Sequence, residues 1–120
     1  MALVGTRFYV SDNSGAKEVQ CIRIVDKGAR IHLGTMLLVS VKAMKHKGKV
    51  AKGDLQFAIV VELKAGQRRR DGSHIASSRN AVVLVSQNKQ PLGTRILGLV
   101  PYEVRRYDGA KLLSLAARTI

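Results

Sequence analysis

The chain has 120 residues, of which 46% are hydrophobic, and its 21 Lys and Arg against 8 Asp and Glu give a net charge of +13. The apolar fraction excludes a disordered basic tail, and the charge imbalance argues against an ordinary globular domain. Most of the surplus cations have no acidic partner within the chain, so a polyanion is their natural counter-charge. The composition therefore predicts a folded domain that associates with nucleic acid.

The length predicts one domain, residues 1–120, large enough to bury a core without disulfide bonds. The lone cysteine, Cys21, lies between apolar neighbours and is interpreted as a small buried hydrophobe. No apolar run reaches the roughly 18–20 residues needed to span a bilayer, and Met1–Gly5 are too short for a signal peptide. We therefore expect no membrane partner, and the methionine at position 1 argues against a cleaved transit peptide.

Apolar residues recur mainly with period two, which is typical of strands. Alternation, together with one continuous apolar run at 81–85, predicts five strands, over residues 6–10, 17–25, 36–43, 55–63 and 81–85. The turn-forming residues 11–15 predict a hairpin between the first two strands.

The fourth predicted strand shows the clearest alternation. One of its faces holds five apolar side chains: Leu55, Phe57, Ile59, Val61 and Leu63. We expect this face to point into the core, with Gln56 and Glu62 on the other face. The fifth run, 81–85, is apolar throughout and suits a strand buried on both sides.

Three adjacent arginines, Arg68 to Arg70, lie between these two strands. They are followed by Asp71 and Gly72, a strong signal for a tight turn because glycine tolerates a positive φ. The pattern predicts a two-stranded ribbon over residues 62–78 with the arginines near its tip.

Only residues 101–120 have a helical pattern. Pro101 can open one short helix, and Asp108 can cap a second one with its apolar residues on one face: Leu112, Leu115 and Ala116. The whole pattern predicts a mainly β fold, a five-stranded β-barrel over residues 1–100 with a projecting β-hairpin ribbon and two short C-terminal helices.

No group of residues predicts catalysis, a metal site or a cofactor. His32, His46 and His74 lie in separate segments without a second ligand at metal spacing. The acidic residues form no acid/base pair on a strand face, and Gly48-Lys49 lacks the upstream glycine of a phosphate-binding loop. We therefore expect no catalytic residues, no metal and no cofactor.

Basic residues gather instead around Gly48 and on the predicted ribbon. On a loop, the first group predicts a flexible cationic surface that can follow a phosphate backbone; the alternative is a solvated face that keeps the protein soluble. The ribbon arginines offer planar, bidentate donors that match phosphate oxygens. The predicted RNA-binding residues are Arg7, Lys17, Lys42, Lys45, Lys47, Lys49, Lys52, Arg68, Arg69, Arg70, Arg105 and Arg106.

The chain has few aromatic residues with which to stack bases: Phe8, Tyr9, Phe57, Tyr102 and Tyr107. A free single-strand-binding module of the cold-shock kind would need several exposed aromatics on its barrel. Recognition of the shape and phosphates of a structured RNA therefore fits better. An enzyme acting on RNA would need an acid, base or metal cluster that the sequence lacks.

Six segments, in this order, resemble one known family: Ser11 to Ala16, Gly48 to Asp54, Arg68 to Ser73, Asn80 to Val83, Gly93 to Gly98 and Lys111 to Ala116. Over nearly the whole chain the pattern resembles ribosomal protein L fourteen of the large subunit, in its bacterial and organellar type. The resemblance implies a structural role, direct binding of large-subunit rRNA and a bridge to small-subunit rRNA. It also implies neighbouring ribosomal proteins of the L three and L nineteen families.

The same resemblance implies a docking site for the ribosome silencing factor, which blocks subunit joining. The family's docking positions correspond to Thr94, Arg95 and Lys111.

Three positions depart from the family pattern. Ser77 replaces the usual aromatic residue, Arg70 replaces a proline common in bacterial members, and Leu99 replaces the proline expected after Gly98. Such drift is typical of a fast-changing lineage. We therefore expect the large subunit of a ribosome in the mitochondrial matrix rather than in a bacterial cytoplasm.

Overall fold

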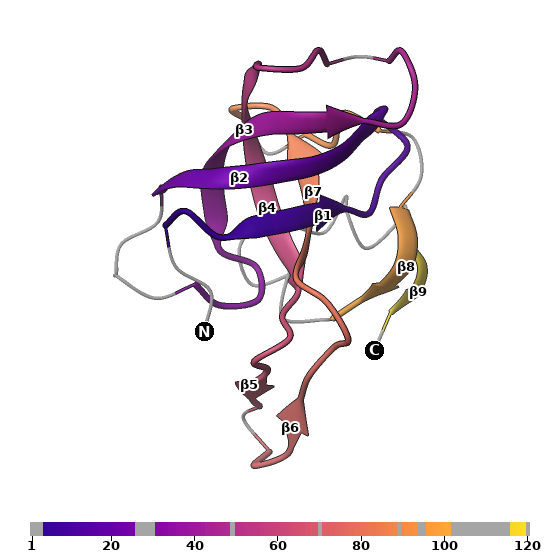
Figure 1. Cartoon of the computed structure of the whole chain (residues 1–120). Helices are drawn as coiled ribbons and strands as arrows, with labels where there is room; N and C mark the ends of the chain where they lie inside the picture. Colours follow the sequence, from indigo (N-terminus) through magenta and orange to yellow (C-terminus); the bar gives the residue numbers. More distant parts are fainter. Residues whose placement is uncertain are drawn as a thin grey trace.

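Five strands form a closed barrel in the order β1-β2-β3-β4-β7 (Figure 1). The computed structural model describes residues 4–25, 31–48, 50–69, 71–88, 90–93, 96–101 and 116–119. The barrel strands are Arg7–Val10 (β1), Ala16–Ile24 (β2), Met36–Met44 (β3), Leu55–Glu62 (β4) and Ala81–Val85 (β7). The predicted five-stranded barrel is confirmed, and every strand begins and ends within one residue of its expected bounds.

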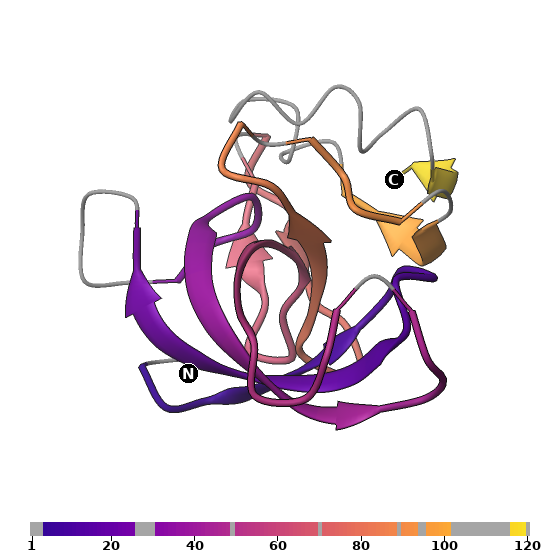
Figure 2. The ribbon, with the colours of Figure 1, turned by 90° about the horizontal axis from the view of Figure 1, so that it is seen from above.

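The barrel closes through a parallel pair. β1 runs antiparallel to β2 but parallel to β7, with Tyr9 opposite Ala81 and Val10 opposite Val82. The other neighbouring strands are antiparallel. Closure leaves these strands without a free edge, which gives a rigid frame for surface side chains. Figure 2, seen from above, shows the strands wrapped around the interior.

Apolar side chains from all five strands fill the barrel interior. They include Phe8, Val19, Leu37, Val39, Val41, Ala58, Val60, Val82 and Leu84. Removing a Val or Leu side chain from water stabilises the fold by roughly 1.5–3 kcal/mol. Leu33 and Val50, from the connecting segments, belong to the same cluster. Cys21 also lies in it, which confirms its interpretation as a buried hydrophobe.

A second apolar cluster joins β4 and β7 to β8 (Ile96–Val100). Its members are Met36, Ile59, Val61, Ala81, Val83, Val85, Ile96 and Val100. Because side chains alternate along a strand, this cluster lies on the outer side of the barrel wall. All five residues of β7 are buried, which confirms the expectation for the fifth strand.

The predicted core face of β4 was wrong in part. Ile59 and Val61 belong to the outer cluster with Phe57 packed against it, whereas Ala58 and Val60 fill the barrel interior. Leu55 is 60% exposed. A β-bulge between Val60 and Glu62 shifts the alternation, so that Leu63 returns to the interior cluster. The error arose because both faces of this strand carry apolar side chains.

The C-terminal part contains a parallel strand pair that the sequence did not predict. β9 (Ala116–Thr119) pairs with β8, and Figure 2 shows both strands to one side of the barrel. The predicted helices fall mainly on residues 102–115, outside the described residues, although Ala116, expected on the second helix, begins β9. Within the described ranges, no helix is long and apolar enough to cross a membrane.

The ribbon consists of β5 (Gln67–Arg68) and β6 (His74–Ile75), which pair antiparallel as predicted. It projects from the lower end of the barrel in Figure 1, and the connection between β3 and β4 crosses the upper end. The two projections therefore lie at opposite ends of a molecule whose longest dimension is 41 Å.

Candidate nucleic-acid interface

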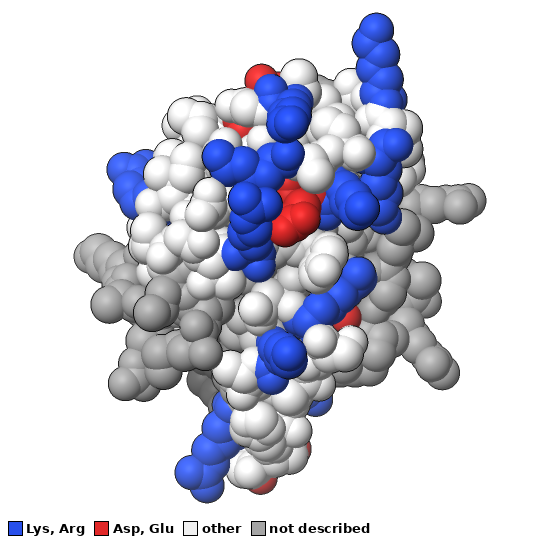
Figure 3. All heavy atoms as spheres, in the orientation of Figure 1, with Lys and Arg blue, Asp and Glu red and all other residues white. Residues whose placement is uncertain are grey.

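Lys and Arg side chains run along one side of the molecule, from the β3–β4 connection, over the wall formed by β1 and β2, to the ribbon (Figure 3). Few acidic side chains interrupt them. On β4 and β7, by contrast, the outer wall is packed against apolar residues of β8. On the face seen in Figure 3, this wall and the two projections therefore form a surface suited to a polyanion.

The basic loop, residues 45–53, is anchored at several points. The Lys45 amide donates to the Gly15 carbonyl at 2.9 Å, and the Gly53 amide donates to the Val41 carbonyl at 2.8 Å. The Val50 side chain is buried in the barrel core. A β-carbon at Gly48 would overlap the Ser14 carbonyl, so only glycine fits this close approach. At these described positions the backbone of the loop therefore lies against the barrel.

The loop presents its lysines outward. Lys45, Lys47 and Lys52 are exposed. Lys42 on β3 and Lys17 on β2 are also exposed, and the pairing of Glu18 with Ala43 brings their parts of the two strands together. Five of the predicted cations therefore gather at one end of the barrel.

Asp12 is a buried side chain that stabilises the turn next to the basic loop. It is 3% exposed, and its carboxylate accepts hydrogen bonds from the Ser14 amide at 3.0 Å, the Ser14 hydroxyl at 2.5 Å and the Leu84 amide at 3.1 Å. Burial raises the pKa of Asp12, and the hydrogen bonds from Ser14 and Leu84 partly oppose that rise. Asp12 thus fixes the turn against which the basic loop packs. The sequence showed the turn but not this role, for which the Asp-x-Ser spacing was the available signal.

The ribbon tip is a tight turn, as predicted. The Arg69 amide donates to the Ser73 carbonyl at 2.7 Å, and Gly72 adopts a φ of +91°. The Asp71 carboxylate accepts from the Ser73 amide at 3.0 Å and the Ser73 hydroxyl at 2.6 Å, which lowers the pKa of Asp71. Arg68 is exposed, whereas Arg69 is half-buried. The predicted arginines therefore differ in how fully they can reach a ligand.

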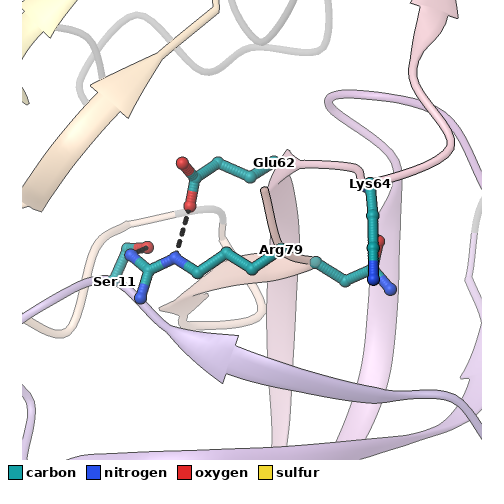
Figure 4. Close-up of polar contacts among 5 residues, drawn as sticks. Ser11, Glu62, Lys64 and Arg79 are labelled. Atoms are coloured by element: carbon teal, nitrogen blue, oxygen red, sulfur yellow. Dashed lines mark hydrogen bonds and ion pairs between the residues drawn. The ribbon is translucent and has the colours of Figure 1, made fainter. Parts of the chain in front are cut away.

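The neck of the ribbon, defined as Glu62, Lys64, Arg79 and Asn80, joins both arms to the barrel. Arg79 donates from Nε to Glu62 Oε2 at 2.9 Å and from Nη2 to Ser11 Oγ at 3.3 Å (Figure 4). The Lys64 amide donates to Asn80 Oδ1 at 2.8 Å. These polar contacts tie the two arms of the ribbon to each other and tie Arg79 to Ser11, next to β1. Sequence reasoning missed Arg79, because its partners are distant along the chain.

The β1 wall carries two exposed side chains of interest. Arg7 forms an ion pair with Glu18 at 3.6 Å. Tyr9 is 48% exposed, and Arg79 Cζ lies 5.8 Å from the centroid of its ring. Arg23 on β2 is also exposed and was not among the predicted residues.

The other predicted site residues lie outside the described residues. These are Lys49, Arg70, Arg105 and Arg106 for RNA, and Thr94, Arg95 and Lys111 for the silencing factor. Within the described part of the chain, no group of three or more His, Cys, Asp or Glu could hold a metal ion. Burial raises the pKa of Cys21, which keeps its sulfur in the unreactive thiol form.

The fold and its charge define a basic β-barrel with a cationic face suited to a polyanion. A family model described as ribosomal protein L14p/L23e matches residues 1–120. The chain belongs to the ribosomal protein L14p/L23e family. It is accordingly a structural component of the large ribosomal subunit, in a family that is generally non-enzymatic and typically binds rRNA and other ribosomal proteins.

Proposed function

We propose that the chain binds large-subunit rRNA directly through the basic loop, the β1–β2 wall and the ribbon, and that it has no catalytic role. The observation that carries this proposal is the run of cations along one side of the barrel, continued onto both projections (Figure 3). The contacting residues are Arg7, Lys17, Lys42, Lys45, Lys47, Lys52, Arg68 and Arg69, joined by Lys49, Arg70, Arg105 and Arg106.

The contacts that hold the backbone of the basic loop support this proposal. Binding costs affinity when a loop must be ordered on the ligand. The basic loop is already fixed by Val50 in the core and by backbone bonds to Gly15 and Val41. Lys45, Lys47 and Lys52 can therefore meet phosphates with less backbone ordering than a loop without these contacts would need.

A salt titration of binding to protein-free large-subunit rRNA tests the ribbon's role. Changing Arg68, Arg69 and Arg70 together to Ala should flatten the slope of log affinity against log salt by about 2–3 units, since each phosphate contact contributes about 0.9. Changing the same three residues to Lys is the matched control and should keep the slope. An unchanged slope in the alanine variant would remove the ribbon from the interface.

The finer assignments rest on the family. We propose that the chain also contributes to a bridge with small-subunit rRNA, next to proteins of the L three and L nineteen families, in a mitochondrial ribosome. We further propose that Thr94, Arg95 and Lys111 dock the ribosome silencing factor. Changing these three residues to Ala should weaken pull-down of the factor while the protein still sediments with large subunits. Full retention of the factor would exclude this docking site.

A further inference from the structure

Tyr9 is an exposed aromatic side chain held on a rigid element. Phe8 and Val10, its neighbours on β1, point into the core, so the Tyr9 ring points outward. β1 is paired on both sides, and the Tyr9 amide donates to the Asn80 carbonyl at 2.9 Å. The ring is therefore presented from a fixed backbone, at nearly half exposure.

The Arg79 guanidinium lies over the Tyr9 ring, with Cζ 5.8 Å from the ring centroid, and is itself oriented. Its hydrogen bonds to Glu62 and Ser11 use two of the five N–H donors of a guanidinium. Its side chain is 40% exposed. A ligand over Tyr9 can therefore contact both an aromatic face and a planar cationic group with further donors.

The charges around Tyr9 favour an uncharged planar ligand over a phosphate. Arg79 is paired with Glu62, and Arg7, two residues before Tyr9 on the same face of β1, is paired with Glu18. The two arginines and two carboxylates cancel, in contrast to the lysine-rich end of the barrel. The surrounding surface is strongly basic, as the proposed rRNA interface requires, but the surface at Tyr9 itself offers stacking rather than net charge.

We propose that Tyr9 and Arg79 form a binding site for one unpaired base of rRNA, which stacks on the exposed part of the tyrosine ring, next to the guanidinium that lies over the ring. Glu62 acts as a positioning residue that holds Arg79 beside the ring. This inference rests on the proposed binding of rRNA and adds a base contact to an interface otherwise made of phosphate contacts.

Two variants at one position separate stacking from other effects. Tyr9→Phe keeps the aromatic ring, and Tyr9→Leu keeps the apolar bulk but removes the ring. Affinity for protein-free large-subunit rRNA should fall roughly 5- to 150-fold in Tyr9→Leu, the range for losing one stacked base, and should stay close to wild type in Tyr9→Phe. The salt slope should not change, because no phosphate contact is lost.

A fully paired RNA duplex serves as the second probe. Its bases are not free to stack on a side chain, so Tyr9→Leu and wild type should bind it equally. Wild-type affinity of Tyr9→Leu for rRNA, or an equal loss on rRNA and duplex, overturns the inference. Failure of the wild-type protein to bind rRNA with a salt-dependent affinity would instead overturn the proposed function itself.

Photo-crosslinking identifies the occupant without relying on affinity. With p-azidophenylalanine in place of Tyr9, irradiated large subunits should yield an adduct between position 9 and rRNA. An adduct to a neighbouring ribosomal protein would assign this surface to a protein partner and overturn the base-binding site.

Discussion

The two cationic projections of this barrel are built in different ways. The basic loop is held by its backbone and core: Gly48 lies against Ser14, and Val50 is buried among the barrel residues. The ribbon is held at its neck by polar contacts, among them the ion pair between Arg79 and Glu62, and by Leu63 and Ile75, which pack in or against the barrel core. Both projections are therefore supported by packing and by hydrogen bonds, and the neck adds an ion pair between the two arms of the ribbon.

This difference predicts which changes affect folding and which affect binding. An alteration to the loop's support should destabilise the whole domain, since the loop shares the barrel core. An alteration at the neck should leave the barrel folded and change mainly the orientation of the ribbon.

The largest effect is expected at Gly48. A β-carbon there would meet the Ser14 carbonyl backbone, which cannot move freely, so Gly48→Ala should destabilise the fold by about 2–3 kcal/mol. Gly53→Ala is the matched control in the same loop. It has open space but a φ of +90°, so it should cost only about 1 kcal/mol. Equal costs in urea denaturation would contradict the close packing of the loop on the turn.

A smaller effect is expected at the neck. Glu62→Gln removes the ion pair with Arg79. Because the Arg79 side chain is partly exposed to solvent, the loss should lower the free energy of unfolding by only about 0.5–1 kcal/mol. It raises the net charge from +13 to +14, so charge alone predicts tighter rRNA binding. If Arg79 positions the ribbon and the base site, binding should instead weaken about 2- to 10-fold.

Glu18→Gln makes the same charge change on the barrel wall and is the control for Glu62→Gln. It releases Arg7 from an exposed ion pair, so rRNA binding should be unchanged or tighter. Tighter rRNA binding by both variants would mean that Glu62 affects binding only through its charge and does not position Arg79.

The smallest expected effect is a pH dependence of stability that has opposite signs at the two projections, through Asp12 near the basic loop and Asp71 at the ribbon tip. Burial raises the pKa of Asp12 beneath the loop above 3.8, so the folded state holds its proton longer than the unfolded state does. The stabilisation that protonated Asp12 gives the folded state is fully present below pH 3.8 and is lost as the pH rises through the raised pKa. Compared with Asp12→Asn, the wild type should therefore lose stability over that interval in denaturation curves.

The pKa of Asp71, at the ribbon tip, is shifted in the opposite direction. Hydrogen bonds from Ser73 lower its pKa below 3.8, so its contribution is present above 3.8 and is lost as pH falls through the lowered value. Carboxyl NMR titrations should give a midpoint above 3.8 for Asp12 and below it for Asp71. Midpoints in the reverse order would contradict the assigned environments.

Much of the barrel could be predicted from the sequence, because period-two alternation marks most of its strands and a continuous apolar run marks β7. The inner face of β4 could not, since Ala58 and Ile59 belong to two apolar clusters on opposite sides of the same strand. The pairing of β8 with β9 was missed because a parallel pair has no hairpin signal between its strands.

Most cations of the proposed interface could be listed from the sequence, although Arg23 and Arg79 were missed, and the contacts that support their segments could not be predicted. Arg79 and Glu62 lie on separate arms of the ribbon, and only the fold brings them within 2.9 Å. The requirement for glycine at 48 is likewise a close approach between segments far apart in the sequence. Sequence patterns report local chemistry, whereas these contacts depend on the tertiary arrangement.

Directed hydroxyl-radical probing tests most directly whether both projections lie against rRNA. Cysteines introduced at exposed positions, Ala51→Cys in the loop and Ala76→Cys in the ribbon, can carry tethered iron-EDTA, while Cys21 is buried. In reconstituted large subunits, both variants should cleave large-subunit rRNA, each at its own set of nucleotides. Absence of cleavage from both positions would contradict the account.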